Sequence, residues 1–394
     1  MKITDVTAMS LSRMHGLDEQ WKTMNFNSIK ADASIVTIHT DEGIVGIAEP
    51  SPYGVPTVIA DIIATKIKPE LIGKDPLEAL SIGFHPNGLS LSYDCAIAGI
   101  DAALWDIRGK VEGKRVADLL RPDGKALTSV RLYASGGCNF DWRANPESLI
   151  EEVVGYQQQG FTASKIRVGT EWGWDDVTPK RTLELYREVR NAVGDAFELM
   201  CDGNWRLTED EALELGRGLD ELHFTWFEEP IHPSNLQGYV RLNEALDLPV
   251  TGGESITTLE QFYPYIESGA YAIAQPDVGI SGITESWRIV EAATRHGIEV
   301  CPHSWHNGLL AMMNANLVAA MPHPHVLELC RIQGPLQWSI LADPPDISNG
   351  HLQFGDGHGF GVNVAEGLET RYPYVEGDWR ITIDREDVAP HGAR

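Results

Sequence analysis

Short apolar segments recur at regular steps through the later two thirds of the chain, and amphipathic stretches lie between them. An alternation of buried strands with amphipathic helices predicts a parallel sheet covered by helices. One of these helices begins with Thr208-x-x-Glu211, which fits a capping box. The expected strands cover residues 130–135, 163–168, 197–202, 224–228, 249–254, 272–277, 298–303 and 325–329.

A polar residue lies at the end of six successive expected strands. The steps between them are 26, 26, 23, 26 and 25 residues, which is the length of a strand, a helix and two loops. Because polar residues end nearly every strand, a closed barrel is favoured over an open sheet, and its strand ends share one mouth. The six residues are Asp202, Glu228, Glu254, Asp277, His303 and Glu328.

The N-terminal part of the chain lacks this alternation. Residues 34–40 and 44–48 form an expected hairpin with Gly43 in its turn, and residues 95–109 have the apolar period of a helix. Residues 14–32 show no clear period and are expected to form a mobile loop. We therefore expect three parts: an α+β capping domain over residues 1–125, a barrel over residues 126–365, and a C-terminal segment, residues 366–394, that returns to the first domain as a strand.

Composition narrows the function classes. The chain has 394 residues, of which 43% are hydrophobic, and a formal net charge of −26. This charge argues against nucleic acid and against anionic membranes as partners. An anionic small molecule remains compatible, because a bound divalent cation reverses the local field. Five scattered cysteines, no apolar run of membrane-spanning length and no signal-peptide core indicate a cytoplasmic protein with reduced thiols.

Three of the strand-end acids are candidate metal ligands. Asp202, Glu228 and Glu254 would face one point and repel each other unless a cation joined them. Oxygen ligands suit Mg²⁺. The alternative is that they are solvated carboxylates that cap the following helices. Glu229 competes with Glu228, because alternation along a strand sends one of the two inward.

Cationic and basic residues complete the candidate site. Lys165 and Arg167 lie two apart on one strand and so point to the same side, which is costly in an apolar strand unless acids face them. The alternative is an edge pair whose charged ends reach solvent. His303 with Asp277 suggests an acid/base dyad, although a strand-end histidine can be merely a surface residue. Glu328 either donates a hydrogen bond when protonated or is structural.

The chemistry that this set predicts is removal of a proton next to a carboxylate. Such a proton is weakly acidic, so the developing enolate needs a metal ion and cations on its oxygens. A base on one side then takes the proton. The fate of the enolate decides the reaction.

These residues resemble the enolase superfamily, and in particular its mandelate-racemase-like subgroup, over essentially the whole chain. The resemblance rests on Lys165-Ile-Arg167, Asp202-Gly-Asn204, Trp226-Phe-Glu-Glu-Pro230, Gly253-Glu254, Gln275-Pro-Asp277, Pro302-His303, Leu327-Glu328 and residues 98–110. It implies a (β/α)₇β barrel with an α+β cap, and Mg²⁺ on Asp202, Glu228 and Glu254. It also implies that Asp277 and His303 form the dyad, that Lys165 lies near the substrate carboxylate, that Glu328 hydrogen-bonds the enolate oxygen, and that Asn204 lies at the site's edge. The family often assembles, so a homo-oligomer is expected.

One departure from the family pattern decides the predicted reaction. The position that usually holds a lysine base opposite the histidine is Arg167, which stays protonated. Lys165 could replace that base only with a lowered pKa. Racemisation needs bases on both faces, so a single-sided dehydration of a sugar acid by His303 is the prediction. A cycloisomerase or lactone-opening enzyme is the alternative, and a racemase or a catalytically inactive carboxylate-binding protein is less favoured. Candidate specificity residues are His15, Trp21, Lys22, Tyr53, Trp305 and His306.

Overall fold

The computed structural model describes residues 1–17, 19–22, 26–82, 85–121, 123–138, 142–169, 176–324, 326–332 and 334–382. Its central feature is a set of eight strands separated by seven helices, in strict alternation. The strands are β6 (Ser129–Ser135), β7 (Ala163–Arg167), β8 (Glu198–Asp202), β9 (Trp226–Glu228), β10 (Val250–Gly252), β11 (Ile273–Ala274), β12 (Glu299–Val300) and β13 (Leu327–Cys330). The helices are α6 (Ser148–Gln158), α7 (Pro179–Val193), α8 (Glu209–Glu221), α9 (Leu236–Ala245), α10 (Leu259–Glu267), α11 (Val278–Arg295) and α12 (Gly308–Ala320).

The strand pairing follows the order of the chain around a barrel. Parallel ladders join β6 through β12 in sequence, and β13 pairs with β6 in parallel. At the β12–β13 junction, the Cys301 thiol donates to the carbonyl of Val326 over 3.3 Å. The predicted α/β barrel of (β/α)₇β type is therefore confirmed. One apolar cluster draws its buried side chains from around the ring, namely Tyr133, Ala163, Met200, Trp226, Ile273, Cys301 and Val326.

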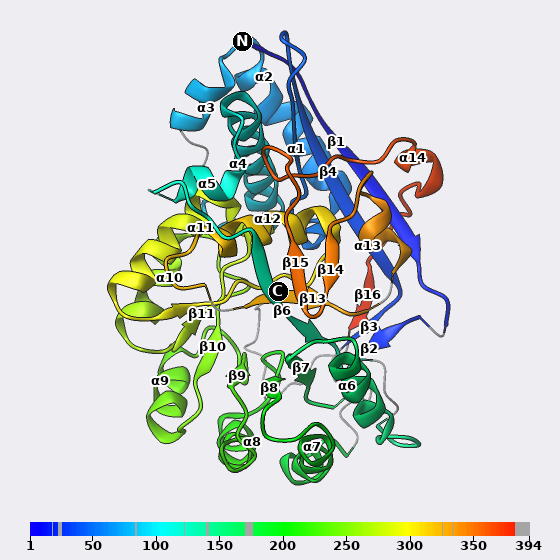
Figure 1. Ribbon diagram of the computed structural model, residues 1–394, viewed down its shortest axis with the longest axis vertical. Helices are drawn as coiled ribbons and strands as arrows, with labels where there is room; N and C mark the ends of the chain where they lie inside the picture. The colour runs from blue at the N-terminus through cyan, green and yellow to red at the C-terminus, as the bar shows by residue number, and fades with distance from the viewer. Residues whose placement is uncertain are drawn as a thin grey trace.

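The N-terminal part forms an α+β unit that lies above the barrel in the view of Figure 1 and packs on α11 and α12. Its antiparallel sheet has the order β1 (Ile3–Met14), β4 (Lys30–Thr40), β5 (Val45–Ala48), and Gly43, with φ of 78°, lies in the β4–β5 turn as predicted. The helices are η1 (Pro52–Gly54), α1 (Pro56–Ile62), η2 (Ile63–Ile67), α2 (Lys68–Leu71), α3 (Pro76–Ile82), α4 (Leu91–Glu112) and α5 (Val116–Leu120). Helix α4 extends the predicted helix at both ends and packs on α11 of the barrel.

The C-terminal part returns to the N-terminal unit. Strands β14 (Asp346–Ser348) and β15 (His351–Gln353) extend the barrel sheet from β6, and α13 (Pro335–Ser339) and α14 (Leu368–Arg371) flank them in sequence. Strand β16 (Arg380–Thr382) then pairs antiparallel with β3 (Phe26–Ser28). Residues 383–394 of the predicted C-terminal segment lie outside the described residues. Within the described ranges, none of the helices combines the length and the apolar character needed to span a bilayer.

Two sequence predictions need correction. Residues 14–32 are not simply a loop, because β2 (Trp21–Lys22) and β3 form a small antiparallel sheet with β16. Their strand partner comes from the far end of the chain, so no local pattern predicts it. The later barrel strands also stop earlier than predicted: β10, β11 and β12 end two or three residues before Glu254, Asp277 and His303. These three residues therefore stand on the loops above the strands. The predicted capping box of Thr208 and Glu211 is present.

Candidate active site at the barrel mouth

Three neighbouring strands bring the first charged residues side by side. In the parallel register of β7, β8 and β9, Arg167 lies opposite Asp202, and Asp202 lies opposite Glu228. All three side chains are at least nine-tenths buried. Because they end their strands in register, they meet at the carboxyl end of the barrel.

Lys165 lies among the buried acids. Its ammonium group pairs with Glu228, lies 2.9 Å from Glu328 Oε1, and lies 3.7 Å from Asp202 Oδ2. Burial lowers the pKa of Lys165, but the negative charges of Glu228 and Glu328 outweigh it and hold that pKa well above its ordinary value. Lys165 is therefore held as a cation, which is the opposite of the lowered pKa that a second base would require.

Arg167 is fixed by three different contacts. Its Nη1 lies 2.8 Å from Asp202 Oδ2, its Nε donates to the Cys138 thiol over 3.1 Å, and its guanidinium lies 4.7 Å from the centre of the Trp305 ring. Lys165 and Arg167 thus point to the same side, toward acids, as predicted for a pair inside a barrel. They are not an edge pair that reaches solvent.

The adjacent glutamates of β9 face different surroundings. Glu228 accepts hydrogen bonds from Gln275 Nε2 over 2.7 Å and from Trp226 Nε1 over 3.1 Å, in addition to its contact with Lys165. Glu229 instead accepts from the backbone N–H of Gly253 over 3.3 Å, and burial holds the pKa of its carboxyl well above the ordinary value. Glu228 is therefore the one that shares the interior with Asp202.

The donor set fits a hard divalent cation. Four carboxylates, those of Asp202, Glu228, Glu254 and Glu328, share the site with Lys165, Arg167 and His303, so negative charge is in excess even when His303 is protonated. Buried Asp202 Oδ2 makes the ion pair with Arg167 but no hydrogen bond of good geometry among the described residues. Burial, together with the charges of Asp202 and Glu328, raises the pKa of Glu228 to about 7 despite the attraction of Lys165. A divalent cation on these oxygens would remove the excess charge.

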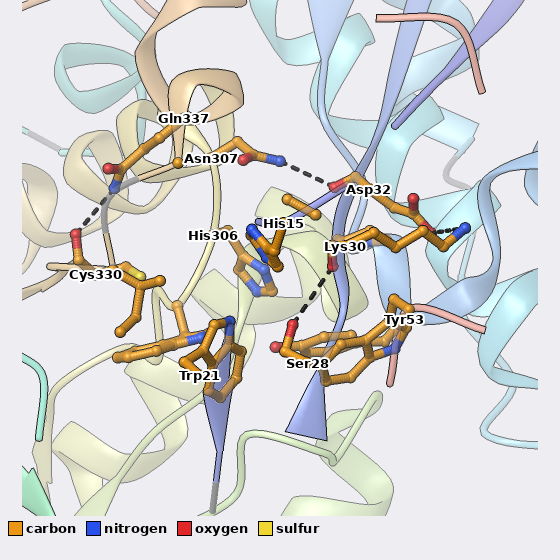
Figure 2. A pocket seen from close by; sticks show the side chains of 16 residues that line it. His15, Trp21, Ser28, Lys30, Asp32, Tyr53, His306, Asn307, Cys330 and Gln337 are labelled. Atoms are coloured by element: carbon orange, nitrogen blue, oxygen red, sulfur yellow. Dashed lines mark hydrogen bonds and ion pairs between the residues drawn. The ribbon is translucent and has the colours of Figure 1, made fainter. Parts of the chain in front are cut away.

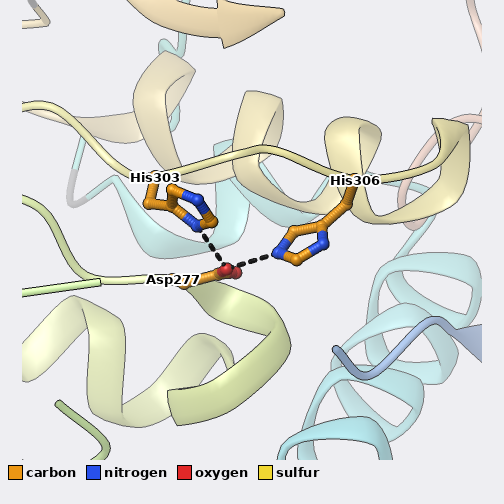
Figure 3. A group of neighbouring side chains, drawn as sticks. All are labelled: Asp277, His303 and His306. Carbon is orange, nitrogen blue, oxygen red and sulfur yellow. Dashed lines mark hydrogen bonds and ion pairs between the residues drawn. The ribbon is translucent and has the colours of Figure 1, made fainter. Parts of the chain in front are cut away.

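Asp277 and His303 are in contact, as the predicted dyad requires (Figure 3). Asp277 caps α11 by accepting from the Gly279 N–H at Oδ1 over 2.8 Å, and its Oδ2 lies 2.8 Å from His303 Nδ1. Burial raises the pKa of Asp277, but the charge of His306 and the hydrogen bonds of both histidines outweigh it and hold this pKa below its ordinary value, so the carboxyl is ionised and Nδ1 of His303 must carry a proton. The other ring nitrogen, His303 Nε2, lies 3.5 Å from Glu254 Oε2.

As long as Glu254 carries no cation, the charges around His303 keep a proton on its Nε2. Burial lowers the pKa of His303, but the charge of Glu254 and the hydrogen bond to Asp277 raise it to about 10. A divalent cation on Glu254 would weaken that attraction. Glu328 accepts from the Ser304 N–H over 2.7 Å, and Lys165 and His303 lower its pKa to about 2 although burial opposes them. These neighbours favour the ionised form of Glu328, and its hydrogen bond to the enolate oxygen stays a prediction.

A second histidine, His306, also contacts Asp277. Its Nε2 lies 2.6 Å from the same Oδ2 that His303 approaches. By spacing alone, Asp277, His303 and His306 could hold a metal ion, because one ligand atom from each lies within 4.8 Å of the other two. Both imidazoles, however, donate to an ionised oxygen, which leaves no nitrogen lone pair pointing at a shared metal. A cation on Asp202, Glu228 and Glu254 therefore stays a prediction, which their all-oxygen ligands favour.

Two cavities adjoin these residues. The larger cavity is lined by Arg167, Asn204, Glu254 and His303, and the predicted specificity residues Trp21, Tyr53 and Trp305 form part of its wall. Asn204 thus lies at the edge of the site, with φ of 47° and its backbone N–H donating to Asp202 Oδ1 over 2.7 Å. A second, smaller cavity lies beside His15 and His306 (Figure 2). Lys22 is instead held in β2, where its N–H donates to the Cys138 carbonyl over 3.1 Å.

Sequence reasoning missed several contributors. Trp379 and Arg380, at the start of β16, line the larger cavity, although they follow the barrel by more than forty residues. The contact of His306 with Asp277 was also missed, because a spacing of three residues in a loop does not fix direction. Gln275 and Trp226 stood in the family motifs without a role, and both donate to Glu228. An alternating pattern on β9, which turns Trp226 and Glu228 to one face, could have identified the latter contact.

Comparison with known proteins identifies the family. Residues 148–368 match the model of the enolase C-terminal domain-like family, and residues 15–121 match the mandelate racemase / muconate lactonizing enzyme N-terminal domain. The chain is 30% identical to D-galactarolactone cycloisomerase from Agrobacterium fabrum, over 94% of this chain and 99% of that protein. It is 31% identical to arabinonate dehydratase from Saccharolobus solfataricus, over 85% of this chain and 89% of that protein.

A solved structure gives the same picture. The crystal structure of the 3,6-anhydro-D-galactonate cycloisomerase from Zobellia galactanivorans superposes with a TM-score of 0.80 at 28% identity, and the match covers 95% of this chain and 100% of that one. The family model alone spans more than half of the chain, and both the barrel and the cap are matched. This protein therefore belongs to the enolase superfamily, in the mandelate-racemase-like group.

Proposed function

We propose that the protein is a Mg²⁺-dependent hydro-lyase that dehydrates a sugar acid, an aldonate or an aldarate, to a 2-keto-3-deoxy acid. His303 Nε2 takes the α-proton. The bond between the β-carbon and its hydroxyl oxygen then breaks, and the same imidazolium gives its proton to the departing hydroxide, which leaves as water. The resulting enol becomes the 2-keto acid. Bound Mg²⁺, on Asp202, Glu228 and Glu254, would neutralise charge that develops on the substrate carboxylate.

One observation carries this proposal: the described cavity lining offers a base on one side. His303 lines the cavity with its Nδ1 bound to Asp277 and its Nε2 left to act as the base once a divalent cation on Glu254 has weakened that attraction, while Lys165 is paired with Glu228 and Glu328 and Arg167 is fixed on Asp202. A single-sided proton transfer suits a reaction that removes and returns a proton on one face. In this scheme, Lys165 and Arg167 bind carboxylate or hydroxyl oxygens of the substrate. Glu328 holds Lys165 and the loop at Ser304 in place, and Asn204 contacts the substrate at the cavity edge. Relatives named as sugar acid dehydratases support the substrate class.

Ring opening is the second candidate. Two similar proteins are named as cycloisomerases, one acting on D-galactarolactone and one on 3,6-anhydro-D-galactonate. The same abstraction by His303 would serve, with a ring oxygen leaving from the β-carbon in place of hydroxide. No water is released, so substrate and product then have equal mass.

A screen separates the two. Purified protein with Mg²⁺ is offered aldonates, aldarates, their lactones and anhydro-sugar acids, and 2-keto acid is measured as its semicarbazone. Mass spectrometry of each hit shows dehydration as the loss of one water and ring opening as an unchanged mass. Chelation by EDTA should abolish the hits, and Mg²⁺ should restore them.

The base is tested in the same assay by His303→Asn. Asparagine keeps an N–H near the position of Nδ1, for the bond to Asp277, but removes the Nε2 base. We expect loss of turnover and of α-proton exchange in D₂O, with Mg²⁺ still bound, whereas exposed His358→Asn, the matched control, should behave as wild type. Dehydration that survived in His303→Asn would refute the single-base mechanism. Absence of both turnover and exchange in the wild type with every acid tested would refute the enzyme proposal.

A further inference from the structure

The carboxylate of Asp277 is shared between two histidines. Oδ2 lies 2.8 Å from His303 Nδ1 and 2.6 Å from His306 Nε2, and the planes of the two rings are nearly perpendicular, at 87°. Figure 3 shows the imidazoles on either side of the carboxylate, both reaching it from the segment that follows β12. Asp277 and the side chain of His306 are at most 1% exposed, so water does not compete for these bonds.

The protonation of His306 follows from the acceptor. An ionised carboxylate oxygen can only accept, so His306 must donate through Nε2–H, as His303 donates through Nδ1–H. The two histidines therefore donate to one oxygen through opposite ring nitrogens. His303 lines the larger cavity and His306 lines the smaller one, and the two cavities adjoin, because Trp21, Tyr53, Trp305 and Trp379 line both. His306 thus approaches Asp277 from the side of the smaller cavity.

The surroundings hold His306 rigidly. The ring of Tyr53, from the N-terminal unit, lies 5.4 Å from the His306 ring, and Asn307 donates to Glu49 Oε1 over 2.9 Å and to the Asp32 carbonyl over 3.1 Å. Figure 2 shows the Asn307–Asp32 bond at the wall of the smaller cavity. The segment that carries both histidines is therefore pinned by the cap as well as by the barrel.

We propose that His306 is a positioning residue for the acid/base dyad: it fixes Asp277 so that the carboxylate presents His303 in one tautomer and one orientation. This inference rests on the proposed function of His303. Without the His306 bond, the buried carboxylate of Asp277 has two donors left, the Gly279 N–H and His303. It can then rotate while it keeps the Gly279 bond, and this rotation moves Oδ2 away from His303. Second partners that orient an active-site ligand typically contribute about 10- to 100-fold to activity.

Two substitutions at one position test the proposal. His306→Gln keeps an N–H near the position of Nε2, whereas His306→Phe keeps a ring against Tyr53 and loses the donor. We expect kcat and α-proton exchange to fall about 10- to 100-fold in His306→Phe, with KM changed less than threefold, and His306→Gln to recover most of the loss. A role in packing alone predicts the reverse, since the phenylalanine preserves the ring. Equal losses in both variants, or a His306→Phe variant within threefold of wild type, overturn the proposal.

A measurement without substrate stands apart from activity. In proton NMR, the wild type should show two low-field imidazole N–H signals from the bonds to Asp277. His306→Phe should lose one signal and shift the other, and His303→Asn should keep the His306 signal alone. If His306→Phe does not fold, the spectra of the wild type, His303→Asn and His306→Gln still test the proposal. Absence of both signals in the wild type, as expected if a metal ion replaced the two protons, overturns the proposal. A wild type that shows both signals but no turnover would refute the proposed function instead.

Discussion

At the scale of single residues, Arg167 tests whether the site needs a fixed cation or a titratable amine. Its guanidinium meets Asp202, the Cys138 thiol and the Trp305 ring at once, which one ammonium group cannot do. We expect Arg167→Lys to lower kcat/KM about 10- to 100-fold, because a charge-assisted hydrogen bond contributes about 1.5–3 kcal/mol. The readouts are product formation and α-proton exchange in D₂O, resolved by face.

The matched control for that substitution is Arg241→Lys, because Arg241 is exposed and pairs with Glu209 on the outside of the barrel. It should leave kcat/KM unchanged. New exchange on the face opposite His303 in Arg167→Lys would contradict the binding role of Arg167 and would show that the position accepts any amine as a base.

At the scale of elements, the C-terminal strand supplies part of the cavity wall. Trp379 lies 5.3 Å from Phe26, 5.2 Å from Tyr53 and 6.1 Å from Trp21, measured between ring centres. We expect Trp379→Ala to raise KM several-fold while kcat changes less, because lost aromatic contacts, at about 0.5–1.5 kcal/mol per pair, loosen the wall and leave the dyad in place. Steady-state kinetics measure this. Val375→Ala, in the same segment and exposed, is the control, and an equal KM change there would contradict the prediction.

The same elements show what sequence could and could not predict. Asp202 and Glu228 end strands in register, so the period of the strands was enough to bring them together. Glu254, Asp277 and His303 lie on loops beyond short strands, and their positions depend on tertiary contacts such as the bond between Asp277 and His303. The β2–β3–β16 sheet joins residues about 350 positions apart, and nothing local to either end specifies that pairing. The family resemblance supplied the roles at these positions.

At the scale of the whole molecule, a buried carboxylate joins the N-terminal unit to the barrel. Glu49 follows β5, and its Oε2 accepts from the N–H of Leu310 in the first turn of α12 over 3.0 Å, while Oε1 accepts from Asn307 over 2.9 Å. A helix N-terminus stabilises the ionised form of a nearby carboxylate. Burial nevertheless outweighs the hydrogen bonds to Glu49 and raises its pKa to about 7. The contact between the two parts of the chain is therefore sensitive to pH near neutrality.

The sign of that dependence is fixed by the direction of the shift. Because the folded protein holds this proton more tightly than the unfolded chain, whose ordinary pKa is 4.5, the stabilisation is complete below pH 4.5 and is lost as pH rises through 7. Glu49→Gln has no such proton. We expect its free energy of unfolding, relative to wild type, to increase by about 2–3 kcal/mol between pH 5 and pH 8, so that the variant becomes relatively more stable. Urea unfolding at both pH values measures this, with exposed Glu366→Gln as control. A difference between Glu49→Gln and wild type that does not change with pH would mean that Glu49 stays ionised throughout, with the α12 terminus and Asn307 fully compensating for its burial.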